Sequence, residues 1–184
     1  MGWKSEHKQH TKARILSAAG QLFTRLGYER VSIDDVMDAA GLTRGAFYAH
    51  FRSKSQLYAE AIVAAASSAR EYLLRSSHDL NTQELAARYL GVGRITGDKN
   101  PCPLAFLATD IQQREEPVRK AYTRVFQGLV TTITRAGGFE DGADEALRNA
   151  VLMVGGVALA RAVNDSALAE QILRVCREGI ASQA

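Results

Sequence analysis

The stretch from Gly41 to Phe51 combines residue types that suit close contact with a nucleic acid. Arg44 carries a planar guanidinium group that can donate two hydrogen bonds to one guanine, and Tyr48 adds a phenolic hydroxyl. Gly45 and two alanines lie between and beside them, and their side chains are too small to hold another surface away. The spacing therefore predicts a helix face that can approach a groove or a phosphate backbone.

Two helices with a tight turn between them would position this face. Ser32 precedes two aspartates and predicts a capped helix over residues 33–40. Gly41 supplies the permissive backbone that a sharp turn needs, and Thr43 is expected to cap the second helix through its hydroxyl. This is the spacing of a helix-turn-helix motif, whose second helix enters the major groove of DNA. An ordinary helical corner in a bundle is the alternative interpretation.

The composition favours an all-α protein. The 184 residues are 46% hydrophobic, include three prolines and show long apolar periods at helical spacing. Two cysteines are too few for a disulfide scaffold and suggest a reducing compartment. The longest apolar run, Val151 to Ala160, is well below the roughly 18 residues that a membrane span needs, and no apolar leader opens the chain. We therefore expect a cytoplasmic protein without a membrane partner.

Charge is distributed unevenly along the chain. Residues 1–58 contain nine Lys or Arg and five Asp or Glu, whereas the remainder contains fourteen basic and fifteen acidic residues. The basic surplus lies with the helix-turn-helix spacing, as phosphate binding by the first part would require. A solvated basic face is the alternative.

Apolar and glycine positions over residues 11–58 form a dense pattern. The positions are Ile15, Leu16, Ala19, Leu22, Phe23, Gly27, Tyr28, Val31, Ser32, Ile33, Val36, Ala40, Gly41, Leu42, Thr43, Gly45, Ala46, Phe47, Tyr48, His50, Phe51, Ser53, Lys54 and Leu57. This pattern closely resembles the N-terminal domain of TetR-family transcriptional regulators. The resemblance implies a homodimeric, ligand-responsive repressor of about nine helices, with a DNA-binding domain over 1–53 and an effector-binding and dimerisation domain over 54–184. It also implies a palindromic double-stranded DNA operator.

The resemblance assigns roles in the DNA interface. Residues that match phosphate-contacting positions of the family are Ser32, Thr43, Tyr48, His50 and Lys54. Arg44 either reads a base or contacts a phosphate, and Gly45 allows close approach. The segment Trp3 to Lys12 either adds phosphate or minor-groove contacts or forms a disordered tail.

The last third of the chain predicts two helices, from about Ala143 to Val163 and around Leu168 to Cys176. The first is apolar nearly all round, so it must be covered on more than one face, and a second subunit is the economical source of that cover. Gly155 and Gly156 would let backbones approach closely. The resemblance likewise places the dimer interface on the two C-terminal helices.

The resemblance places a small-molecule effector among the helices after residue 54. Candidate contacts are Phe106, Asp110, Tyr122, Phe126, Met153 and Arg161. Each of the apolar members has an ordinary core position as its alternative. Cys102, between two prolines and close to Lys99, is a separate candidate for a thiol that oxidants or electrophiles modify, or else a small buried hydrophobe.

Catalysis and metal binding find little support in the sequence. Acidic pairs stand at predicted helix starts, where the helix dipole accounts for them. His7-x-x-His10 lacks further ligands at suitable spacing, and no cofactor motif occurs. A helical adaptor that binds a protein partner is the second hypothesis after a DNA-binding regulator, and an enzyme is the third.

Overall fold

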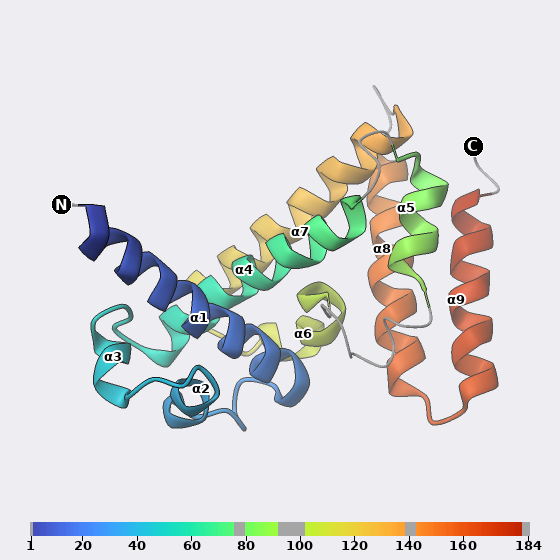
Figure 1. The fold of residues 1–184 in the computed structure, drawn as a ribbon. Helices are drawn as coiled ribbons and strands as arrows, with labels where there is room; N and C mark the ends of the chain where they lie inside the picture. The colour runs from blue at the N-terminus through green and yellow to red at the C-terminus, as the bar shows by residue number, and fades with distance from the viewer. Residues whose placement is uncertain (1, 76–79, 92–101, 139–142, 182–184) are drawn as a thin grey trace.

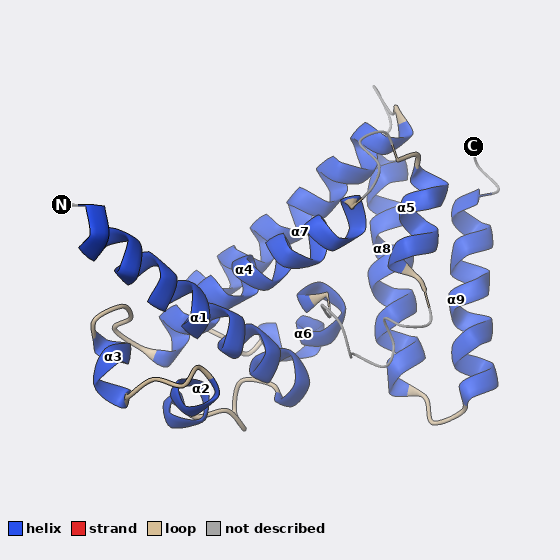
Figure 2. Cartoon of the chain, viewed as in Figure 1, coloured by secondary structure: helices blue, strands red, loops and turns tan. Residues whose placement is uncertain are grey.

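The computed structural model describes residues 2–75, 80–91, 102–138 and 143–181. Within these ranges the chain forms nine α-helices and no strand, so the prediction of an all-α protein is confirmed (Figure 2). The helices are α1 (Gly2–Leu26), α2 (Ile33–Ala39), α3 (Arg44–Tyr48), α4 (Lys54–Leu74), α5 (Thr82–Tyr89), α6 (Pro103–Ile111), α7 (Glu116–Gly137), α8 (Ala143–Ala162) and α9 (Ser166–Ala181). No helix in the described ranges has the length and apolar character that a membrane crossing would require.

The helices form two packed regions joined by two long elements. Helices α1, α2 and α3 lie at one end, and α5, α8 and α9 stand side by side at the other (Figure 1). Helices α4 and α7 run together between the two ends, with α6 beside them. Helix α4 belongs to both regions, because Leu57 and Tyr58 lie in the first buried cluster and Leu73 in the second.

Each region has its own buried cluster. The first cluster is formed by α1 to α3 together with Leu57, Tyr58 and Ile62 from the first half of α4. The second gathers the apolar sides of α5, α8 and α9 and the second half of α7. Ile111, at the end of α6, belongs to the first cluster. The start of α7 packs on the first cluster, and its end packs on the second.

Local capping agrees with the sequence at Ser32 and differs at Thr43. The Ser32 hydroxyl accepts from the Asp35 amide at 3.0 Å, and the Asp35 carboxylate accepts from the Ser32 amide at 2.7 Å. Thr43 does occupy the cap position of α3, but its side chain makes no capping hydrogen bond, so that prediction was wrong. A helix of five residues held by buried side chains does not depend on a cap.

The N-terminal segment also differs from the expectation. Helix α1 begins at Gly2, so the segment from Trp3 to Lys12 is helical and the disordered-tail alternative is wrong. The apolar stripe that indicated a helix starts only at Ile15 and ends at Leu26, because no residue from Glu6 to Arg14 belongs to the first buried cluster. Their side chains from Glu6 to His10 are exposed. Periodicity reports burial and therefore missed the solvated extension.

Candidate functional site

Helix α3 presents a polar, low-relief face at the surface. Arg44, Gly45 and Tyr48 are exposed, with 61% of Tyr48 accessible, whereas Phe47 and Phe51 are fully buried beneath them. The two phenylalanine rings lie 5.6 Å apart between centroids and fix the helix to the first cluster. Helix α3 thus carries a guanidinium group, a phenol and an exposed glycine backbone on one face.

Arg44 is held in place by α2. Its guanidinium donates to the Asp34 carboxylate, and both side chains remain about half exposed. The pKa of Arg44 is raised, first by its hydrogen bond with Tyr48 and then by the negative charge of Asp34. The sequence assigned Asp34 only to the helix dipole, but the structure makes it the group that orients the principal candidate for base reading.

Ser32 and Thr43 stand at the ends of α2 and α3 that border this face, and both are exposed. Ser32 is engaged by the capping box, and its hydroxyl donates to Asp35 at 2.7 Å. Those bonds lower the pKa of Asp35 below its ordinary value, first through the Ser32 side chain and then through the Ser32 backbone. Because Thr43 makes no cap, its hydroxyl is the more accessible of the two.

Lys54 and His50 flank the same face less directly. The Lys54 ammonium lies over the Tyr28 ring, 4.1 Å from the centroid, which keeps the lysine at the start of α4. His50 is half-buried, and its Nδ1 atom is buried without a hydrogen-bond partner among the described residues. Burial lowers the pKa of His50 below 6.5, and the positive charges of Lys8 and Lys12 lower it further. Both effects favour the neutral form of the imidazole in the free protein.

The turn between α2 and α3 is fixed by a residue that the sequence did not single out. Gly41 has a φ of 63°, a left-handed conformation that disfavours side chains. The Arg14 Nη2 atom donates to the Ala40 carbonyl at 2.6 Å, and a Cβ placed on Gly41 would lie 3.2 Å from that same nitrogen. Arg14 thus caps the end of α2 from α1. No local sequence pattern indicated it, since the pairing joins residues 26 positions apart.

A polar junction joins the first region to the end of α6. The Tyr58 hydroxyl donates to Asp110 at 2.6 Å, and Arg114 pairs with Glu29 in the turn after α1. The side chain of Arg114 is only 9% exposed, and its guanidinium stacks over the Tyr28 ring. Asp110 was a candidate effector contact, but it lies at this junction and serves to hold α4 against α6.

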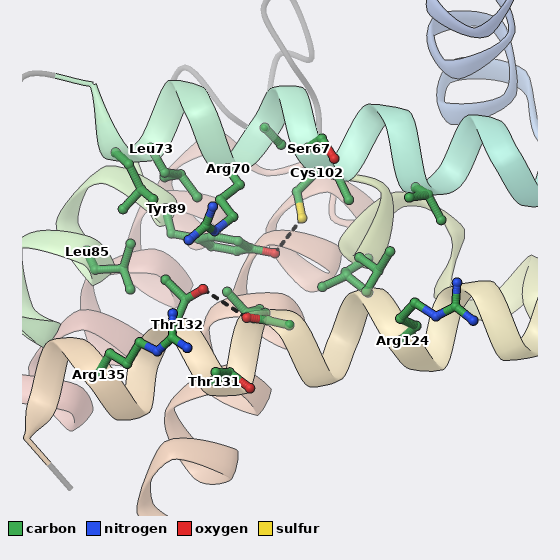
Figure 3. A pocket seen from close by; sticks show the side chains of 18 residues that line it. Ser67, Arg70, Leu73, Leu85, Tyr89, Cys102, Arg124, Thr131, Thr132 and Arg135 are labelled. Atoms are coloured by element: carbon green, nitrogen blue, oxygen red, sulfur yellow. Dashed lines mark hydrogen bonds between the residues drawn. The ribbon is translucent and has the colours of Figure 1, made fainter. Parts of the chain in front are cut away.

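A ligand-sized space lies between α4 and α7. It is a cavity of about 380 Å³, shown in Figure 3. Its walls are Val63, Ala66, Ser67, Ala69, Arg70, Leu73, Leu74, Leu85, Tyr89, Cys102, Leu104, Arg124, Val125, Gly128, Leu129, Thr131, Thr132 and Arg135. At its inner wall the Tyr89 hydroxyl donates to the Cys102 sulfur at 2.9 Å. The volume is at the lower end of the range for small-molecule pockets, about 300–1,000 Å³.

Cys102 is the one predicted effector residue that lines this cavity. It is 7% exposed, and Lys99 and Pro101, which supported the reactive-thiol hypothesis, lie outside the described residues. Tyr122 instead donates to the Leu104 carbonyl at 2.7 Å, and burial raises its pKa to about 12. The hydrogen bond ties α7 to α6.

The remaining candidates also lie elsewhere. Met153 is fully buried in the second cluster, and Phe126 is partly buried against it. The Arg161 guanidinium sits over the Phe106 ring, 3.3 Å from the centroid, and burial lowers the pKa of Arg161. Aromatic and Met positions at helical spacing were thus indistinguishable from core positions, and the arginines and threonines of α4 and α7 that do face the cavity carried no apolar signal.

The outer faces of α8 and α9 are apolar and uncovered in the single chain. Val151 and Leu159 are 57% and 60% exposed, and Leu147 and Gly155 continue the same line at intervals of four residues. Val175 on α9 is 53% exposed. These exposed apolar side chains on two neighbouring helices form an apolar patch of a kind that is typical of a protein interface.

No cluster of three or more His, Cys, Asp or Glu side chains suited to a metal ion occurs among the residues that the structure describes. His7 and His10 lie on the exposed side of α1 without further ligands.

Comparison with known proteins agrees with this geometry. Residues 15–61 match the family model described as bacterial regulatory proteins, tetR family. The transcriptional regulator TtgR of Pseudomonas putida is 36% identical over 72 residues, which cover 39% of this chain and 34% of TtgR. AcrR of Shigella flexneri is 42% identical over 55 residues, covering 30% of this chain and 26% of AcrR. The matched segment thus spans about a third of the length of these curated relatives or less.

Solved structures extend the likeness to the whole fold. A TetR-family transcriptional regulator from Agrobacterium tumefaciens has a TM-score of 0.72 and 26% identity, covering 94% of this chain and 98% of that one. The reduced form of NemR from E. coli has a TM-score of 0.76 at 17% identity, with 94% and 96% covered, and shares the fold. Residues 15–61 thus match the tetR family model, and the whole chain has the fold of a TetR-family transcriptional regulator.

Proposed function

We propose that this protein is a DNA-binding transcriptional regulator, a repressor that binds a palindromic operator as a homodimer and leaves it when a small molecule binds. The observation that carries the proposal is the exposed face of α3, where Arg44, Gly45 and Tyr48 stand on a helix anchored by buried phenylalanines. An arginine beside small side chains suits bidentate contact with guanine O6 and N7. Lys54 and Thr43 at the borders suit phosphate contacts that set the register.

The apolar patch on α8 and α9 supports the dimer. The patch lies at the opposite end of the molecule from α3 (Figure 1), so a two-fold pairing there leaves both reading helices free. A two-fold symmetric dimer of this kind binds two DNA half-sites that form an inverted repeat. We place the functional division at residue 53, with α4 belonging to both regions, and we place the protein in the cytoplasm with its DNA.

Selection of bound sequences from random duplexes by the full chain tests this proposal. We expect a near-palindrome whose half-sites are about 34–36 Å apart, one helical turn, and an affinity that falls steeply with salt. Arg119→Ala removes a positive charge at an exposed position of α7, outside α3, and this control variant should select the same sequence as the parent protein.

The helical adaptor is the alternative that this experiment separates. Binding without sequence preference and with equal affinity for heterologous DNA would contradict the regulator and leave the adaptor. The curated relatives matched here are named as transcriptional regulators, which favours the first hypothesis.

A further inference from the structure

Charge at the cavity between α4 and α7 has one sign. Three of its lining residues are arginines, Arg70, Arg124 and Arg135, and none is an aspartate or glutamate. Among the described residues, none of the three guanidinium groups has a carboxylate partner. Elsewhere in the described part of the chain, Arg44, Arg114, Arg148 and Arg174 each form an ion pair, whereas other exposed arginines such as Arg119 form none. Unpaired arginines gathered around one apolar space indicate a negatively charged occupant.

Apart from Ser67 and Cys102, the uncharged polar side chains of the cavity already donate hydrogen bonds within the protein. The Thr131 and Thr132 hydroxyls donate to the carbonyls of Gln127 and Gly128, at 2.9 and 2.8 Å. The Tyr89 hydroxyl donates to Cys102. The guanidinium groups are therefore the principal donors that remain for a ligand, and they favour an acceptor with a full negative charge.

The positions of the arginines suggest where that charge would lie. Figure 3 shows Arg70 of α4 and Arg135 of α7 extending into the space from its two sides, at the end where Tyr89 and Thr132 lie. Arg124 lies toward the other end. An anionic group at the first end can contact both helices at once, while leucines such as Leu73, Leu104 and Leu129 supply an apolar wall for the rest of a ligand.

We infer that this cavity binds an amphipathic organic anion, a small carboxylate with an apolar aromatic or aliphatic body. Arg70 and Arg135 hold the carboxylate, and the leucine wall holds the body. A cationic amphiphile is excluded, because three like charges would repel it. The inference rests on the proposed function in treating this ligand as the effector. Arg70 and Tyr58 share α4, so a ligand that bridges α4 to α7 acts on the helix that reaches the first buried cluster.

Calorimetric titration of the full chain with three probes of one shape tests the inference. Phenylbutyrate, phenylbutanol and phenylbutylamine share the apolar body and differ in charge. We expect phenylbutyrate to bind about tenfold more tightly than the alcohol and the amine to bind most weakly. Equal affinities, preference for the amine, or no binding of phenylbutyrate at millimolar concentration would overturn it.

Two kinds of variant assign the binding to this cavity. Arg70→Gln and Arg135→Gln should each weaken the binding of phenylbutyrate about threefold to tenfold and leave the binding of phenylbutanol unaltered. The expected effect is modest because the charges are exposed. Arg119→Gln on the same helix α7 is the control and should alter neither. Gly128 lines the cavity, and a Cβ at this position would meet nothing within 4 Å. Gly128→Leu should therefore fill the space and abolish the binding of both ligands, while the helix stays folded. Unchanged phenylbutyrate binding by Gly128→Leu would place the site elsewhere and overturn the assignment.

Operator binding is measured in the same samples. The experiment therefore tests the ligand class and the ligand-responsive regulator independently. Release of DNA by phenylbutyrate, lost in Arg70→Gln, supports both. An anion preference without any effect on DNA keeps the ligand class and contradicts the ligand-responsive regulator. Sequence-specific DNA binding with no anion preference keeps the regulator and overturns the ligand class.

Discussion

The two ends of the molecule differ in how far their charged and apolar side chains are paired or buried within the single chain. At α3, Arg44 forms an ion pair with Asp34, and the apolar anchors Phe47 and Phe51 are buried. At the other end, apolar side chains of α8 and α9 face outward, and arginines without carboxylates surround a cavity. In the proposed regulator, the face of α3 is preformed for DNA, and the apolar side chains and the cavity are the surfaces assigned to a second subunit and a ligand.

Breaking the apolar patch should have the largest effect. Val151→Glu combined with Leu159→Glu places two carboxylates on the outer face of α8, where both side chains are more than half exposed in the single chain. The fold should survive, but the dimer should dissociate. Operator affinity should then fall about a hundredfold or more, because two half-sites are no longer bound by one particle. Sedimentation and fluorescence anisotropy measure the two quantities.

The matched control for that variant lies in the other region. Leu26→Glu changes a comparably exposed leucine at the end of α1 and should leave the protein dimeric. A dimer that persists in the α8 double variant, with unaltered DNA affinity, would show that the subunits pair through another surface.

Removing the guanidinium of Arg44 should weaken operator binding by about 1–3 kcal/mol and relax the preference at one base pair in each half-site. The neighbouring Asp34 sharpens this test. Asp34→Asn keeps the shape of the side chain but frees Arg44 from its ion pair and removes a negative charge near the phosphates. We expect Asp34→Asn to bind all duplexes more tightly, with a steeper salt dependence and less discrimination.

Sequence selection separates the two roles that the sequence left open for Arg44. An unchanged consensus for Arg44→Ala would make it a phosphate contact only. If Asp34→Asn binds operator no more tightly than the parent protein, the ion pair is not a competitor for DNA.

The same contrast explains what could be predicted from the sequence. The capped start of α2 at Ser32 and the glycine turn at Gly41 depend on interactions within a few residues, so their spacing reveals them. The contact between Arg14 and Ala40 depends on packing of helices distant in sequence and left no pattern. The cavity was misjudged for a related reason. Its walls include Arg70 and Arg135, whose side chains are indistinguishable in sequence from any solvated arginine until α4 and α7 are placed together.

The junction between the two regions should contribute a smaller, measurable coupling. Burial, followed by the hydrogen bond to Asp110, raises the pKa of Tyr58 far above its usual range, so the phenol remains a donor at all ordinary pH values. A double-mutant cycle of Tyr58→Phe and Asp110→Asn should give an interaction energy of about 1–2 kcal/mol in chemical denaturation. Additive single effects would mean that the 2.6 Å contact contributes nothing to holding α6 on α4.

The smallest expected effect belongs to His50, and its sign distinguishes folding from DNA binding. Its pKa in the folded protein is lowered from 6.5, mainly by burial and further by Lys8 and Lys12. The unfolded chain therefore takes up a proton first as the pH falls, so the stabilising contribution is complete above the unfolded pKa and is lost as the pH decreases toward the folded pKa. A phosphate beside the imidazole would raise that pKa in the complex, so DNA binding should take up a proton and strengthen as the pH falls. His50→Gln, which cannot gain charge, should flatten both trends. Denaturation and anisotropy titrations above and below pH 6.5 measure them, and an operator affinity whose pH dependence is the same in His50→Gln as in the parent would place His50 away from the phosphates.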